Sequence, residues 1–265
     1  NNIVLGVGAG DAITDGNYNV LLGGNNCGGA IIGGSGNVGL GGSALEAITT
    51  GDYNIALGYN SGQGNSGADH NISLGYTAGD LTGPGNVAIG RGTLSGNNSG
   101  EYNVGIGYLA GNVATTTSGS VFVGKYAGGT VTTGNNNIAV GNDAMNGATT
   151  TGDNNIAIGV SAGDALTGGN NNIFMGRNAG GTSTTDANNI LIGHDAGSGA
   201  WTGSPSYQNT VVGDGAMKGA MNGANYNSAF GAYTLYSVTT GDSNTSLGHN
   251  SGNLISTGVQ NTLIG

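Results

Sequence analysis

One short motif recurs sixteen times along this chain and limits what the chain can fold into. The motif usually reads Asn, an aliphatic residue or Thr, a variable residue, an aliphatic residue and Gly, as in residues 54–58 and 86–90. Successive closing glycines are 17 or 18 residues apart, except for one gap of 15 and one of 20. A fixed period of this kind predicts a repeat architecture. The closing glycines are Gly6, Gly23, Gly41, Gly58, Gly75, Gly90, Gly107, Gly124, Gly141, Gly159, Gly176, Gly193, Gly213, Gly231, Gly248 and Gly265.

The local pattern within each repeat predicts one coil of a β-solenoid. The motif alternates with period two, which is typical of a short strand. A small residue followed by Gly, as at Ala162 and Gly163, then predicts a corner, and the apolar run after it predicts a second short strand. A Thr-rich corner leads back to the next Asn, whose amide we expect to bond the coils on either side as a ladder. Stacking at about 4.8 Å per coil gives an all-β parallel β-solenoid over residues 1–265 as a single domain.

The alternation also predicts which side chains face the interior. In residues 54–58, Ile55 and Leu57 are expected to fill the coil, and Ala56 is expected to face outward. The outward position is small in many coils but large and apolar in others, which favours burial between subunits over a half-exposed strand face. The large residues, our candidates for that interface, are Leu21, Phe122, Phe174, Leu191, Val211 and Leu263.

Composition excludes several classes of function. The chain has 59 Gly in 265 residues, so a helical fold is not expected. Only 4 residues are Lys or Arg and the net charge is −10, which argues against nucleic-acid binding. Cys27 is the one cysteine, so no intrachain disulfide can form, and we expect its side chain to be buried as a small apolar group. No apolar run is long enough to predict insertion of this segment into a membrane.

The polar residues do not predict a catalytic or cofactor site. His194 and His249 share a position in the repeat but lie three coils apart, and His70 occupies a different position. We therefore expect no enzyme activity and no cofactor. Asp residues at the Thr-rich corner are expected to form turns by bonding their own backbone, and cation binding where subunits meet is the alternative. These corner residues are Asp52, Asp153 and Asp242.

Two irregular stretches and a set of aromatic residues are the places where a specific contact could form. Residues 27–34 and the 20-residue coil that contains Trp201 and Pro205 are expected to form loops on the outside. Exposed aromatic side chains are typical of recognition surfaces, although packing at corners is the more common role of such residues. The candidates for surface recognition are Trp201, Tyr207, Tyr59, Tyr76 and Tyr108.

The motif followed by Ala-Gly resembles the head repeats of trimeric autotransporter adhesins, the YadA-like heads, over nearly the whole chain. The coil here is longer than in those heads. The longer coil, with its Thr-Thr-Gly-Asp corners, is similar to repeats of phage tail fibres. The resemblance implies a left-handed β-roll, three chains per rod, and a structural or adhesive role.

We therefore expect a non-catalytic segment of an extracellular fibre, either on a virion appendage or on a bacterial surface. Its expected partners are two further copies of itself and neighbouring fibre segments at both ends, because both ends of the chain lie within the motif. A host-surface glycan or protein is a possible ligand. One alternative is an adhesin head whose side binds a host ligand, and another is an ice-binding solenoid that uses the Thr doublets.

Overall fold

The fold is described by a computed structural model that covers residues 1–64, 66–96, 99–201 and 203–265. It divides into two compact units, Asn1–Thr133 and Gly134–Gly265. The regular elements in these ranges are strands of three residues each, so the all-β class is confirmed. The first unit contains β1 (Ile3–Leu5), β2 (Val20–Leu22), β3 (Val38–Leu40), β4 (Ile55–Leu57), β5 (Ile72–Leu74), β6 (Val87–Ile89), β7 (Val104–Ile106) and β8 (Val121–Val123). The second contains β9 (Ile138–Val140), β10 (Ile156–Ile158), β11 (Ile173–Met175), β12 (Ile190–Ile192), β13 (Thr210–Val212), β14 (Ser228–Phe230), β15 (Thr245–Leu247) and β16 (Thr262–Ile264).

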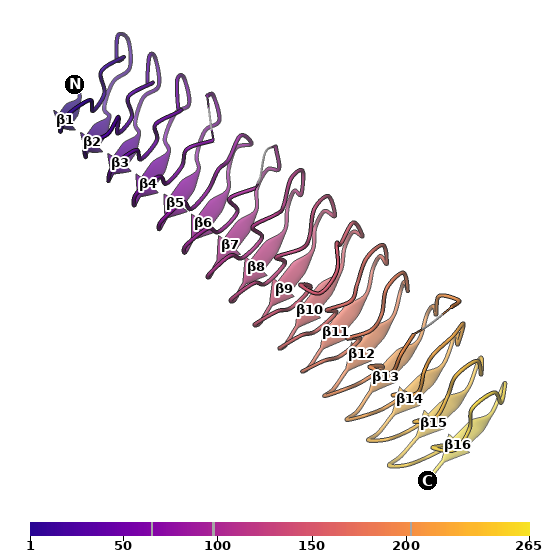
Figure 1. The fold of residues 1–265 in the computed structure, drawn as a ribbon. Coiled ribbons are helices and arrows are strands. Elements are labelled where there is room, and N and C mark those ends of the chain that lie inside the picture. Colours follow the sequence, from indigo (N-terminus) through magenta and orange to yellow (C-terminus); the bar gives the residue numbers. More distant parts are fainter. Residues whose placement is uncertain (65, 97–98, 202) are drawn as a thin grey trace. The chain divides into compact units, whose positions relative to one another are not determined.

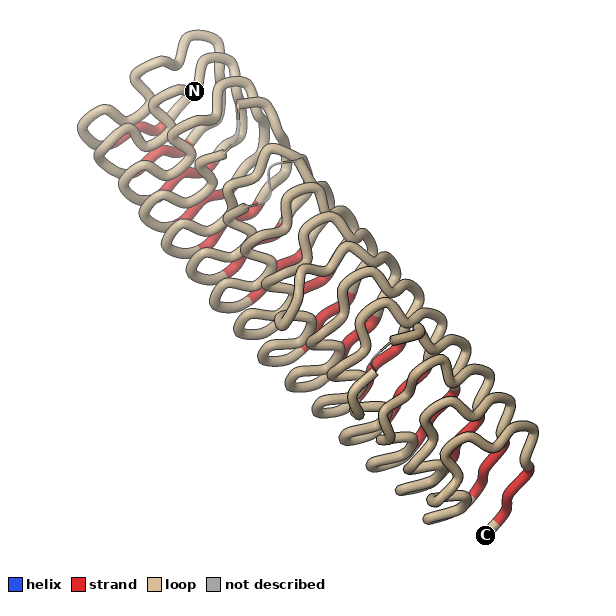
Figure 2. The backbone as a smooth tube through the Cα atoms, turned by 45° about the vertical axis from the view of Figure 1, so that its right-hand side comes forward, coloured by secondary structure: helices blue, strands red, loops and turns tan. Residues whose placement is uncertain are grey.

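Each unit is a parallel β-solenoid, as the repeat predicts. Every strand pairs in parallel with the strand of the next coil in its unit, so that β7 and β8 align Val104 with Val121 and Ile106 with Val123 (Figure 1). Loops and turns complete every coil, and the strands form one column within each unit (Figure 2). That residues 1–265 form a single domain stays a prediction.

The expected second strand of each coil is absent from the described residues, and this prediction was wrong. Turns replace it because several positions in a coil take a positive φ, which interrupts an extended backbone. The corner glycines just before the expected strands are examples, with φ 60° at Gly128 and 59° at Gly163. The apolar side chain of the expected strand is nevertheless buried, as Ile48, Val131 and Leu166 show. The predicted burial of the apolar residue was therefore right, and the predicted backbone conformation was wrong.

The middle residue of each strand, and not the flanking pair, faces the interior of the coil. Ala56 is fully buried, whereas Ile55 on the same strand is 36% exposed. The predicted orientation was therefore wrong. A three-residue strand has one side chain on one face and two on the other, and the narrow coil holds only the single one. The corner glycines make room for it: a Cβ on Gly111 would lie 2.6 Å from the ring of Phe122.

This inverted orientation removes the predicted interface residues from the outer surface. Leu21, Phe122, Phe174, Leu191 and Val211 are fully buried within their own chain, so they cannot contact another subunit. Leu263, in β16, is half-buried and also faces inward, because its Cδ1 would lie 3.1 Å from a Cβ on Gly252. The outer face of each strand consists instead of the two flanking residues, which are both aliphatic or Met from β1 to β12.

The predicted asparagine ladder is present in both units. In the first unit, the backbone N–H and the side-chain amide of Asn103 donate to Asn86 Oδ1 over 2.9 and 3.1 Å. Asn86 Nδ2 in turn donates to the carbonyl of Gly100 at 3.0 Å. The same pattern joins Asn172 to Asn155 in the second unit. Each buried amide thus bonds the backbone of its neighbouring coils, which satisfies polar groups that burial would otherwise leave unpaired.

The first irregular stretch belongs to the core and does not form an outer loop. Cys27 and Ile31 are both fully buried, and burial raises the pKa of the Cys27 thiol. The prediction that Cys27 packs as a small apolar group is confirmed, while the predicted outer loop at residues 27–34 was wrong. The reason is that Gly28 continues the ladder by donating to the carbonyl of Ala44 at 2.8 Å.

Candidate functional site

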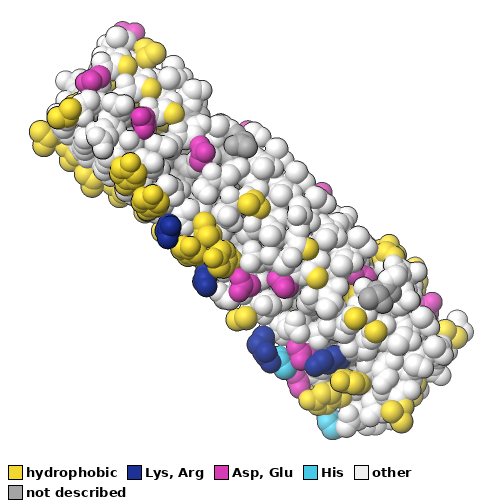
Figure 3. Space-filling view, viewed as in Figure 1, with side chains coloured by type: hydrophobic (Ala, Val, Ile, Leu, Met, Phe, Trp, Pro, Cys, Tyr) yellow, Lys and Arg dark blue, Asp and Glu magenta, His cyan; other side chains and the backbone are white. Residues whose placement is uncertain are grey.

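The residue that follows the closing glycine in each coil forms a column along one edge of the solenoid. In the first unit this column contains Tyr59, Tyr76, Arg91, Tyr108 and Lys125. We call these five residues, together with Tyr126, the aromatic–basic stripe. Basic and hydrophobic side chains lie close together along one edge of the surface in Figure 3. Three of the residues predicted for surface recognition thus belong to one column.

The closing glycine fixes where each stripe residue lies. Gly107 has φ 134°, and a Cβ at this position would lie 2.5 Å from the carbonyl oxygen of Gly124 in the next coil. Only glycine permits this close approach of two backbones. The carbonyls of the stripe residues then accept hydrogen bonds from the next coil, as Tyr108 does from the N–H of Tyr126 at 2.9 Å. The stripe therefore has the regular spacing of the ladder.

The side chains of the stripe contact one another in sequence. The rings of Tyr59 and Tyr76 stack with centroids 5.8 Å apart and an interplanar angle of 16°. The guanidinium of Arg91 lies between the next two rings, 5.7 Å from the centroid of Tyr76 and 5.6 Å from that of Tyr108. These distances are within the range of cation–π attraction. The interactions hold the guanidinium in place while it remains exposed.

The stripe continues through Tyr108 to its second basic residue. The rings of Tyr108 and Tyr126 make an edge contact with centroids 5.4 Å apart, and Lys125 Nζ lies 5.1 Å from the centroid of Tyr126. In the described part of the chain, no carboxylate is within ion-pair distance of Arg91 or Lys125. These two residues are the only Lys or Arg of the first unit, against seven Asp or Glu. The positive charge of this unit is therefore concentrated on the stripe.

The same edge of the second unit has a different electrostatic character. His194 Nδ1 lies 2.7 Å from Asp214 Oδ1, and Arg177 contacts the other ring nitrogen of His194. Lys218 Nζ donates to Asp195 Oδ2 at 2.7 Å. Sequence analysis missed this cluster because it compared the histidines with one another and not with the carboxylates one coil away. Lys218 and the His194 ring thus each have a carboxylate partner, while Arg177 contacts the His194 ring.

The pKa values of the two carboxyls follow from these contacts. Partial burial acts to raise the pKa of Asp195, but hydrogen bonds from Lys218 and Asn178 hold it below its ordinary value. Hydrogen bonds from His194 and Tyr233 lower the pKa of Asp214. Both carboxylates are therefore ionised near neutral pH and offset the basic side chains next to them.

Trp201 and Tyr207 lie apart from the stripe, in the second unit. Trp201 is only 6% exposed, so the predictions that it serves surface recognition and that its coil forms an outer loop at this residue were wrong. Its large indole packs inward, against Gly197, where a glycine leaves space for it. Tyr207 is 40% exposed and forms an isolated bridge with Ala187. Its role in recognition stays a prediction.

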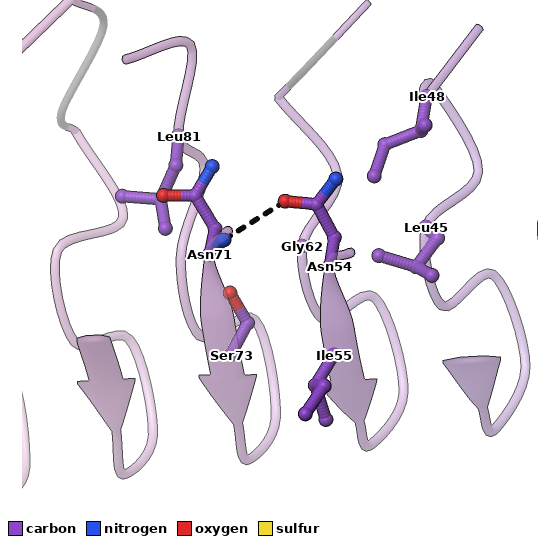
Figure 4. A pocket seen from close by; sticks show the side chains of 8 residues that line it. All are labelled: Leu45, Ile48, Asn54, Ile55, Gly62, Asn71, Ser73 and Leu81. Carbon is purple, nitrogen blue, oxygen red and sulfur yellow. Dashed lines mark hydrogen bonds between the residues drawn. The ribbon is translucent and has the colours of Figure 1, made fainter. Parts of the chain in front are cut away.

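A small internal cavity lies where the 15-residue coil meets its neighbour. The cavity has a volume of about 10 Å³ and is lined by Leu45, Ile48, Asn54, Ile55, Gly62, Asn71, Ser73 and Leu81 (Figure 4). The N–H of Asn71 donates to Asn54 Oδ1 at 3.0 Å, but Asn71 Nδ2 has no partner. The carbonyl of Gly83, at the corresponding place in the short coil, instead accepts the side-chain amide of Asn86 at 2.9 Å. The cavity is about the size of one water molecule, which is too small for an organic ligand.

The corner aspartates bond a neighbouring coil and not their own turn, which corrects their predicted role. Asp52 Oδ1 accepts the backbone N–H of Ser35, and Asp153 Oδ1 accepts that of Asn135, both at 2.7 Å. Among the described residues no group of three His, Cys, Asp or Glu could hold a metal ion. Within the same ranges the structure has no helix long and apolar enough to cross a bilayer.

The threonine hydroxyls of the Thr-rich corner also serve the ladder. Thr115 Oγ1 donates to the carbonyl of Thr132 at 3.0 Å, and Thr239 Oγ1 donates to that of Ser256 at 3.2 Å. These hydroxyls use their donors within the solenoid. Ice binding stays a prediction, which an assay of thermal hysteresis tests.

Asp186 gives a testable dependence of stability on pH. Burial raises the pKa of its carboxyl, although the backbone N–H of Ser206 donates to it. The folded state then holds the proton more tightly than the unfolded state, so stability falls as pH rises from about 4 through the folded pKa. Asp186→Asn should remove this contribution. The midpoints of thermal unfolding of the wild type and the variant, measured over this pH range, test the prediction. Equal slopes of midpoint against pH in the two proteins would contradict it.

The fold and these surfaces define a parallel β-solenoid repeat protein with an exposed aromatic–basic edge. In comparisons with known proteins, no family model and no curated protein matches the chain.

Proposed function

We propose that this chain is a structural and adhesive fibre segment that assembles as a homotrimer through the outer face of its strands. The observation that carries the proposal is the flanking pair of each strand, the two residues that face away from the coil. In β4 to β12 these pairs consist of Ile, Val, Leu and Met. They form two apolar columns along β4 to β8 of the first unit and along β9 to β12 of the second. In β13 to β16 the first residue of the pair is Thr or Ser and the second stays apolar.

The exposure of this outer face supports its burial by another chain. Leu40 is 46% exposed and Ile106 38%, and in the second unit Phe230 is 41% and Leu247 53% exposed. No strand contains a charged residue. Monomeric soluble proteins rarely expose contiguous apolar patches above a few hundred Å². A second copy of the chain can bury this outer face, because its own columns of side chains have the same spacing and also carry no charge.

The number of copies and the location follow from the resemblance to adhesin heads and tail fibres. Those heads contain three chains per rod, with a role in attachment. We extend this arrangement to the present chain, on a virion appendage or a bacterial surface, with neighbouring fibre segments at its ends. The proposed role requires no enzyme activity and no cofactor.

Light scattering at micromolar concentration tests the assembly. Three chain masses are expected for the wild type. Ile106→Glu should shift the mass toward one chain, because it places a charge within the apolar face. Val113→Glu is a matched control, since Val113 is also 38% exposed but lies in a corner outside the strands.

Two results would count against the proposal. A wild-type protein that scatters as a single chain would remove the homotrimer. Equal loss of mass in both variants would show that the effect is not specific to the outer face. Circular dichroism of both variants, compared with the wild type, verifies that the fold is retained.

A further inference from the structure

We propose that the aromatic–basic stripe of the first unit binds an acidic polysaccharide, a glycan chain that carries carboxylate or sulfate groups at intervals. This inference deepens the adhesive part of the proposed function and rests on it. It names the surface and the chemical class of ligand, neither of which the fibre role requires.

The stripe combines the two chemistries that such a ligand needs. The guanidinium of Arg91 is held between Tyr76 and Tyr108, is exposed, and has no carboxylate partner within the described residues. A planar guanidinium can donate two parallel hydrogen bonds to a carboxylate or sulfate. The tyrosines, of which Tyr59 is 49% and Tyr76 52% exposed, offer rigid amphipathic surface and hydroxyls for neutral sugar units.

The spacing of the charges favours a ligand whose anionic groups are sparse. Arg91 and Lys125 are two coils apart, which corresponds to about 9.6 Å at the ladder spacing. Tyr108 lies between them. A glycan that carries a charge on alternate sugars could contact both basic residues and place an uncharged sugar against this ring.

The overall charge argues against a denser polyanion. The first unit contains seven acidic residues against the two basic residues of the stripe. Nucleic acids carry one charge per roughly 1.7 Å of duplex and need many basic contacts to bind. A densely charged chain would meet net repulsion from this unit, whereas a sparse one can align its charges with the two basic side chains.

The second unit provides an internal comparison. Its equivalent edge holds Arg177 and Lys218, but His194 links the first to Asp214, and Asp195 binds the second. An anion at Lys218 would have to compete with Asp195, and an anion at Arg177 would meet the negative charge of Asp214 across the His194 ring. The stripe of the first unit is therefore the preferred site, and Arg177→Gln is a matched control for Arg91→Gln.

Isothermal titration calorimetry with hyaluronate, which carries one carboxylate per two sugars, κ-carrageenan, which carries one sulfate per two sugars, and uncharged dextran tests the inference on the whole chain. Binding is expected for one or both charged glycans and not for dextran, and comparing the two charged probes distinguishes carboxylate from sulfate. Arg91→Gln and Lys125→Gln should each weaken binding about tenfold, as expected for loss of a charge-assisted hydrogen bond. Arg177→Gln should leave the affinity unchanged. All three positions are on the surface, and melting temperatures verify that the variants are folded.

Several outcomes would overturn the inference. These are absence of binding to both charged glycans, equal binding to dextran, equal or tighter binding to duplex DNA, and equal loss of affinity in Arg91→Gln and Arg177→Gln. A change of oligomeric mass in Arg91→Gln without loss of glycan binding would assign the stripe to contacts between copies. The mass measured by light scattering is independent of these titrations, so failure of the homotrimer and failure of the glycan site can be told apart.

Discussion

Replacing Phe122 by Ala should lower the free energy of unfolding by about 3–5 kcal/mol, the range for a fully buried aromatic residue. The ring is completely buried and lies against Gly111 and Gly128 of its own and the following corner. Closely packed backbone surrounds the ring, so we expect the neighbouring residues to fill little of the space that the Ala substitution leaves. Urea or thermal unfolding of both proteins measures the change.

The control for this prediction is Val121→Ala, on the same strand. Val121 is on the outer face and only partly buried, so its truncation should cost about 1 kcal/mol or less in a single chain. If Phe122 were an interface residue, its loss would instead change the oligomeric mass and leave the stability of the isolated chain almost unaltered. The pair of variants thus distinguishes the two orientations of the strand.

Asn86→Ala should also lower the free energy of unfolding by about 3–5 kcal/mol, because it leaves several buried polar groups without hydrogen-bond partners. Asn86 Oδ1 accepts both the N–H and the amide of Asn103, and its own amide donates to the carbonyls of Gly83 and Gly100. An alanine supplies none of these bonds. Chemical denaturation of purified variants is the measurement.

Asn71→Ala provides the comparison for the ladder. Asn71 accepts the N–H of Asn86 at 2.8 Å, but its amide nitrogen has no partner. Asn71→Ala should therefore lower the free energy of unfolding by about 1–2 kcal/mol, because only the N–H of Asn86 loses its acceptor. Equal costs at the two positions would show that amide bonds to the carbonyls contribute little, and the ladder would then owe its stability to the backbone alone.

The repeat period made the class of fold predictable from the sequence, while the orientation of the strand was not. Alternation separates the middle residue from its neighbours, but it does not tell which side is the interior. Large residues such as Phe122 and Phe174 were the informative signal. Glycines four residues after a closing glycine, such as Gly111 and Gly128, accompany Phe122, and they indicate that its ring needs space within the coil.

The stripe was predictable in part. The tyrosines at positions 59, 76 and 108 share one place in the repeat, so their alignment followed from the period. Arg91 and Lys125 occupy the same place, but their importance depends on the absence of nearby carboxylates in the described residues, which only the structure shows. Trp201 was misplaced because an aromatic residue in an irregular coil gives no indication of which way its side chain turns.

The nearest-neighbour arrangement of the coils has a consequence for how such a chain can change in length. Within each unit, strands contact only the strands of adjacent coils. Deleting one whole repeat, such as residues 108–124, would join Gly107 to Lys125, which occupies the same place in the repeat as Tyr108. Duplicating the repeat would likewise keep every residue at its place in the coil. The hydrogen bonds, the buried amide and the outer pair would all be restored by the next coil. Unequal recombination between repeats can thus lengthen or shorten the protein in whole steps, whereas a gain or loss of a few residues disturbs the coil in which it falls.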